Sequence, residues 1–61
     1  MQEIYGVMIA GVLIPIGGDG EDNAIDKAVR LYQILHPETE TGYLKKLAEV
    51  KLLADWKNNN H

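Results

Sequence analysis

Residues 4–18 read IYGVMIAGVLIPIGG, a stretch without one charged side chain that makes up about a quarter of the 61-residue sequence. A strand with a single buried face alternates apolar and polar residues. Here both alternating registers are apolar, one with Ile4, Met8, Val12 and Ile14, the other with Tyr5, Val7, Ile9 and Leu13. Both faces of this stretch are therefore expected to be covered, by the rest of the chain or by another molecule.

A β-hairpin is predicted over residues 3–16. β-Branched and aromatic residues dominate the segment, and Ala10-Gly11 stands at its centre, where a two-residue turn would place its glycine. Pro15 has no N–H to donate to a neighbouring strand, so the second strand is expected at the edge of a sheet or to end near that residue. The edge of this strand is a candidate docking site.

A helix is predicted over residues 21–35, after the break Gly17-Gly18-Asp19-Gly20. It ends at His36-Pro37, because a residue that precedes proline disfavours the helical conformation. Its apolar residues recur at helical spacing and are expected to pack against the hairpin. They are Ala24, Ile25, Ala28, Leu31, Tyr32 and Leu35.

The C-terminal segment admits two interpretations. Its composition favours a helix, but residues 47–57 alternate as a strand would, with Val50, Leu52 and Trp56 on one side and Lys51 and Asp55 on the other. The strand is preferred because a third strand would complete a sheet for the helix to cover. We therefore predict an α+β fold of order ββαβ, with ββαα as the alternative, in a single domain at residues 1–57 and a disordered tail at 58–61.

The short length of the chain favours self-association. A chain of this length buries only about 60% of its unfolded surface, so small domains rely on disulfides, a structural metal or self-association. Cysteine is absent, and the two histidines, His36 and His61, are too far apart for common metal-ligand spacings. A homo-oligomer, most simply a dimer, is predicted.

The chain offers little chemistry for catalysis. It has neither serine nor cysteine, which leaves Thr39 and Thr41 as the hydroxyl nucleophiles of the usual kind. The loop GGDG at residues 17–20 lies where phosphate-binding loops occur, but it lacks their lysine and hydroxyl, and Asp19 would repel a phosphate. No catalytic residue, cofactor or metal is predicted, and the protein is expected not to be an enzyme.

Charge is unevenly distributed. Residues 1–26 carry five acidic and no basic residues, whereas residues 27–61 carry six basic and four acidic ones, for a net charge of −3 overall. Such an acidic chain lacks the electrostatic attraction that drives most nucleic-acid binding, so nucleic acid is an unexpected partner. The apolar run is too short to span a bilayer as a helix, and no basic region of a signal peptide precedes it. A cytoplasmic location is expected.

The leading functional hypothesis is a non-enzymatic protein-interaction module, which self-associates through its hairpin and binds or modulates an unidentified protein partner. An accessory protein of a phage or other mobile element would suit this size. Two alternatives stay open: a nucleic-acid-associated protein using Lys45, Lys46, Lys51 and Lys57, and a minimal oligomeric enzyme. The candidate interface residues are Tyr5, Val7, Ile9, Leu13 and Trp56.

Overall fold

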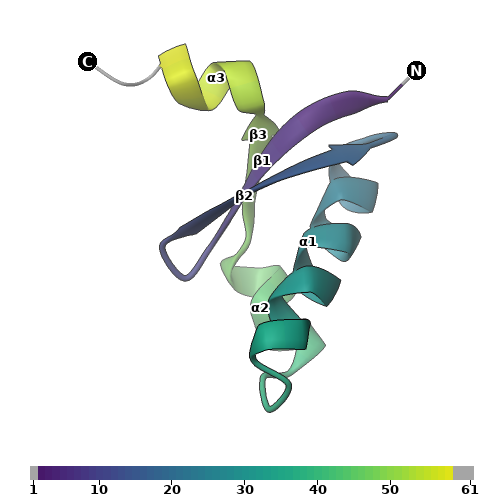
Figure 1. Cartoon of the computed structure of the whole chain (residues 1–61), viewed down its shortest axis with the longest axis vertical. Helices are drawn as coiled ribbons and strands as arrows, with labels where there is room; N and C mark the ends of the chain where they lie inside the picture. Colours follow the sequence, from purple (N-terminus) through teal and green to yellow (C-terminus); the bar gives the residue numbers. More distant parts are fainter. Residues whose placement is uncertain (1, 59–61) are drawn as a thin grey trace.

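The computed structural model describes residues 2–58 and consists of a three-stranded antiparallel sheet with three helices (Figure 1). The strands are β1 (Glu3–Ile9), β2 (Val12–Gly18) and β3 (Glu49–Leu52), in the spatial order β2-β1-β3. The helices are α1 (Glu21–Leu35), α2 (Thr41–Leu47) and α3 (Leu53–Asn58). The predicted α+β class is confirmed.

The hairpin forms around the expected turn. Ala10 and Gly11 both have positive φ, at 50° and 82°, which is typical of the tight turns that match the twist of a hairpin. Ile9 pairs with Val12 beside this turn, and the pairing continues without a break to Glu3 opposite Gly18. β2 is an edge strand, as Pro15 predicts, but it continues three residues beyond that proline.

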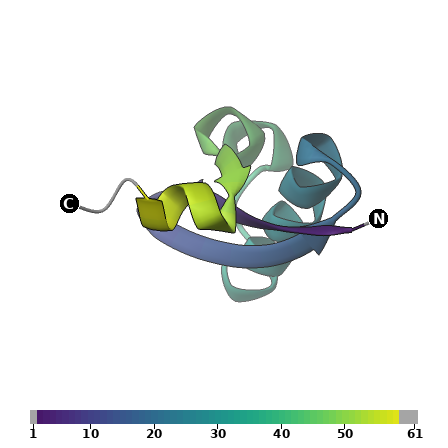
Figure 2. The ribbon, with the colours of Figure 1, turned by 90° about the horizontal axis from the view of Figure 1, so that it is seen from above.

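One face of the sheet makes the core. Tyr5, Val7 and Ile9 point from β1 toward α1 and α2, where they meet the small side chains Ala24 and Ala28 of α1. Small residues on α1 let its backbone approach the sheet closely, and Leu44 of α2, fully buried, fills the space beside them. Figure 2 shows α1 and α2 beside the sheet in the view from above.

The prediction of a long C-terminal strand is wrong in extent. Only Glu49–Leu52 is a strand, and it is flanked by helices α2 and α3, so the order is ββααβα and each of the two predicted alternatives describes a part of it. Val50 and Leu52 face the core as the strand pattern requires. The helical segments use the good helix formers that the composition indicated, and they carry Leu44 into the core.

The chain turns into α3 directly after β3, and this reverses the predicted side of Trp56. In a continuous strand Trp56 would face the same way as Leu52, into the core. In the structure its indole contacts Gly6, a residue whose side-chain direction is opposite to that of Tyr5 and Val7. Asn58, predicted to begin the tail, is the last residue of α3, and the rest of that tail, 59–61, lies outside the described residues.

Candidate functional site

The predicted interface residues divide between the two faces of the sheet. Tyr5, Val7 and Ile9 are buried in the core of the chain itself, so their side chains are not accessible to a partner in this structure. Leu13 and Trp56 lie on the opposite face and come together there. A side chain at Gly6 would meet both of them, Leu13 Cδ1 at 3.0 Å and Trp56 Nε1 at 2.8 Å.

Trp56 is held against the sheet by a hydrogen bond from its ring nitrogen and by a cation over the face of its ring. Its Nε1 donates a hydrogen bond to the carbonyl oxygen of Gly6 over 2.6 Å. Lys51 Nζ lies 4.6 Å from the ring centroid, within the range of a cation–π interaction. The only feature of the sequence that indicates this packing is Gly6, because a glycine inside a strand often marks a place where another group approaches the backbone closely. These contacts make Trp56 a structural element of the single chain.

Two ionisable groups have pKa values moved by their surroundings. Burial raises the pKa of the Tyr5 hydroxyl, and the nearby carboxylates of Glu3 and Glu21 raise it further. The hydrogen bond and charge of Lys45, whose Nζ is 2.8 Å from the carboxylate, lower the pKa of Asp26. That ion pair therefore adds stability above the ordinary pKa of an aspartate and loses it as the pH falls through the lowered value. Both side chains are half exposed, so solvent screens the pair.

The lysines proposed for nucleic-acid contact are spread over three elements. Lys45 and Lys46 are in α2, Lys51 is in β3 and Lys57 is in α3. Two of them have partners in the chain, since Lys45 binds Asp26 and Lys51 covers Trp56.

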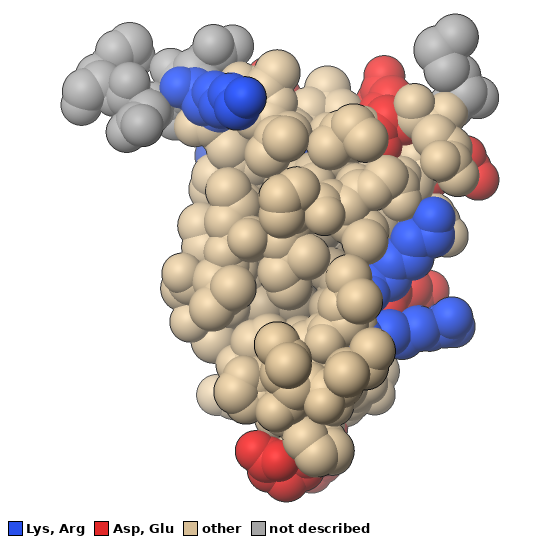
Figure 3. Space-filling view, viewed as in Figure 1, with Lys and Arg blue, Asp and Glu red and all other residues tan. Residues whose placement is uncertain are grey.

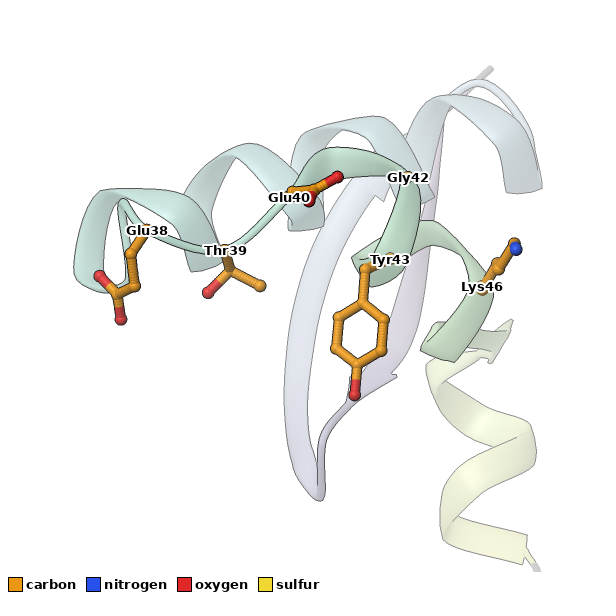
Figure 4. A pocket seen from close by; sticks show the side chains of 6 residues that line it. All are labelled: Glu38, Thr39, Glu40, Gly42, Tyr43 and Lys46. Carbon is orange, nitrogen blue, oxygen red and sulfur yellow. The ribbon is translucent and has the colours of Figure 1, made fainter.

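A hollow of about 660 Å³ lies at the start of α2. Its lining residues are Glu38, Thr39, Glu40, Gly42, Tyr43 and Lys46. Figure 4 shows these side chains pointing in different directions, with Tyr43 and Lys46 turned away from each other. Acid–base catalysis needs titratable groups that converge on one atom, and this surface does not provide such an arrangement.

The free edge of β2 is obstructed at two of its three outward positions. Since Ile9 and Val12 close a two-residue turn, Leu13, Pro15 and Gly17 direct their backbone groups away from β1. Pro15 has no N–H to offer at the centre of this edge, and Lys27 Nζ already donates to the Gly17 carbonyl oxygen over 3.0 Å. The edge predicted as a docking site is thus poorly suited to pairing with another strand.

Pro15→Val is expected to open this edge to strand pairing between chains, because it restores the missing N–H at the central outward position. Static light scattering should show at least about a twofold rise in mean mass over the parent, since one edge pairing joins two particles. Ile16→Val is the control, because the backbone of Ile16 pairs with Tyr5 of β1. Unchanged mass for Pro15→Val would contradict the role given to the proline.

An exposed apolar surface lies where β2 meets the C-terminal half of α1, and we call it the apolar patch. Its members and their exposed fractions are Val12 at 51%, Leu31 at 45%, Ile34 at 74% and Leu35 at 77%. It surrounds a groove of about 260 Å³, which is lined by Val12, Ile14, Leu31, Tyr32, Leu35 and His36. In Figure 3 the broad middle of the face in view, over the hairpin and the lower part of α1, is free of Lys, Arg, Asp and Glu side chains, which lie at its margins.

Part of the apolar patch was predicted from the sequence to be buried. Leu31 and Leu35 were expected to pack against the hairpin along with Ala24 and Ala28, but only the N-terminal half of that helical face is buried. The signal that could have indicated the patch is Ile34, an apolar residue that lies off the stripe formed by the other apolar positions of the helix. Leu31, Ile34 and Leu35 are three large aliphatic residues within five positions of α1, and the sheet leaves all three exposed.

Within residues 2–58, no cluster of three or more His, Asp or Glu side chains could hold a metal ion. None of the described helices combines the length and the apolar character needed to cross a membrane. No protein-family model, curated protein or solved structure matches this chain. The fold and its surfaces define the class as a small α+β domain with helices packed on a three-stranded antiparallel sheet.

Proposed function

We propose that this protein is a non-enzymatic protein-interaction module, which self-associates through the apolar patch and binds or modulates a protein partner. The observation that supports this proposal is that Val12, Leu31 and Leu35 line one apolar groove with about half or more of their surface exposed. Ile34, directly before Leu35 in α1, is exposed as well. Single exposed apolar residues are ordinary, but contiguous ones around a groove are typical of contact surfaces.

The hairpin was expected to form the contact surface, but it supplies only a small part of the apolar patch. Its buried face supplies the core, and only its turn-proximal residue Val12 and the groove residue Ile14 reach the patch. α1 supplies the remaining apolar side chains. The proposed module therefore uses the junction of hairpin and helix as its contact surface.

Light scattering coupled to gel filtration tests the proposal. At tens of micromolar the parent is expected to exceed the monomer mass of 6.8 kDa. Leu35→Lys is expected to reduce that mass to the monomer value, since it places a charge in the lining of the groove. Tyr43→Lys is the control, because Tyr43 is similarly exposed but lies in α2 beside a different hollow. A parent that elutes as a monomer would contradict self-association.

A further inference from the structure

We propose that the apolar patch is occupied by a second copy of this chain, related by a two-fold axis, with the two α1 helices antiparallel and Ile34 of each copy seated in the groove of the other. This inference rests on the proposed function and adds the occupant and the geometry. It follows from three features: the exposed side chain of Ile34 in α1, an apolar groove lined in part by that helix, and charges of opposite sign before and after Ile34, namely Arg30 in α1 and Glu38 in the turn that follows the helix.

The groove is large enough to hold the side chain of an Ile34 from another copy. The side chain of Ile34 is 74% exposed, and it is not among the residues that line the groove, so the chain itself does not bury it. The groove, of about 260 Å³, is apolar except at His36 and the Tyr32 hydroxyl. A cavity of about 150 Å³ admits benzene, so a groove of this size accepts the four carbons of an isoleucine side chain.

The positions of these two features suit a two-fold contact. In such a contact the same patch serves both copies, so the projecting side chain of one must reach the recess of the other while its own recess is filled. Ile34 is three residues after Leu31 and directly before Leu35, both of which line the groove. The projection and the recess are therefore neighbours on one helix, as mutual insertion requires.

The charges at the margins favour the antiparallel arrangement. Arg30 lies in α1 one turn before Ile34, and Glu38 lies in the turn that follows the end of α1 at Leu35; both side chains are exposed. A two-fold axis near Ile34 brings Arg30 of one copy close to Glu38 of the partner subunit, and the reverse pair forms by symmetry. Antiparallel helices also oppose their dipoles, and the last turn of α1 has no basic residue of its own to complement its negative end.

Other surfaces are less suited to a second copy. The edge of β2 lacks a central donor at Pro15, and its Gly17 carbonyl is already bound by Lys27. On the outer face of the sheet, Trp56 covers Gly6 from within the same chain. The members of the apolar patch are instead 45–77% exposed, and they lie beside a groove with a mostly apolar lining.

Ile34→Asp tests the insertion. We expect the dimer dissociation constant, measured by sedimentation equilibrium, to rise about 30-fold or more, as for the loss of a buried interface anchor. The melting temperature at concentrations where the parent is monomeric should change little, because the side chain is exposed in the single chain. Tyr43→Asp is the matched control, and its dissociation constant should equal that of the parent.

Reversal of the flanking charges tests the antiparallel register. Arg30→Glu is expected to weaken the dimer about 3- to 10-fold, because it sets two like-charged pairs at the rim. The double variant Arg30→Glu with Glu38→Arg should return to the parent affinity. The double variant Arg30→Glu with Glu49→Arg, which changes an exposed residue of β3, should not. Failure of the double variant to recover would overturn this register.

The outcomes separate this inference from the proposed function. A parent dimer that is unaffected by Ile34→Asp would overturn the inference and leave self-association standing, with its contact elsewhere. A parent that is monomeric at every concentration would overturn both. Loss of the dimer in Ile34→Asp, together with recovery in the charge-reversed double variant, would support the two-fold arrangement.

Discussion

Val7→Asp is expected to unfold the protein. Val7 is fully buried on the central strand, where it pairs with Ile14 of β2 and Val50 of β3 and faces the helices. An unpaired carboxylate at this position costs several kcal/mol. A domain of this length has a total stability of only about 3 to 9 kcal/mol. Far-UV circular dichroism at 25 °C and a thermal melt should show a chain without a cooperative transition.

Met8→Asp is the matched control for this variant. Met8 is the next residue of the same strand, but it points to the outer face of the sheet and is partly exposed. The same charge placed there should leave a folded protein with a lowered melting temperature, because solvent reaches the carboxylate. If Val7→Asp melted at the same temperature as the parent, the assignment of the core face would be wrong.

Gly6→Ala is expected to displace the indole of Trp56. A Cβ at this position would collide with Trp56 Cδ1 and would lie 2.8 Å from its Nε1, so the ring must move and the hydrogen bond to the Gly6 carbonyl is lost. Overpacking of this kind costs about 1 to 3 kcal/mol. Because Trp56 is the only tryptophan, its fluorescence reports the change directly, and we expect emission shifted to the red with a lower melting temperature.

Gly17→Ala is the control for this substitution. Gly17 lies on β2, and the nearest atoms to an added Cβ there are 3.7 Å away, an ordinary contact. Its fluorescence should match that of the parent. The self-association proposed above uses residues of α1 and β2 rather than Trp56, so Gly6→Ala should retain the parent mass if it stays folded. Unchanged emission from Gly6→Ala would show that the indole does not pack on the strand.

Local patterns in the sequence were sufficient to predict the hairpin and α1. The turn at Ala10-Gly11 depends on two adjacent residues, and the helix boundaries depend on the glycine-rich break before Glu21 and on His36-Pro37 after Leu35. These features act over a few residues, so they can be recognised without knowledge of the fold. From Pro15 the sequence predicted that the second strand lies at an edge or ends near that residue, and β2 is an edge strand that continues to Gly18.

The position of the apolar patch could not be predicted from such local patterns. Tyr5 and Val7 are as apolar as a contact surface would require, but the helices bury them, whereas Leu35 fits the helical stripe and is left uncovered. Which apolar residues are buried depends on where the sheet ends beneath α1, and that boundary is set by packing between segments distant in the sequence.

The sequence by itself determined an α+β domain built on a hairpin and a helix, because backbone preferences and short-range periodicity are properties of neighbouring residues. Only the tertiary structure decided that β3 stops at Leu52, that Trp56 crosses to the outer face over Gly6, and that Ile34 and Leu35 remain exposed. The physical reason is that helix and strand propensities in the C-terminal segment are nearly balanced. Burial of Leu44 in the core, and the packing of Val50 and Leu52 against that core, then select the conformation of each part.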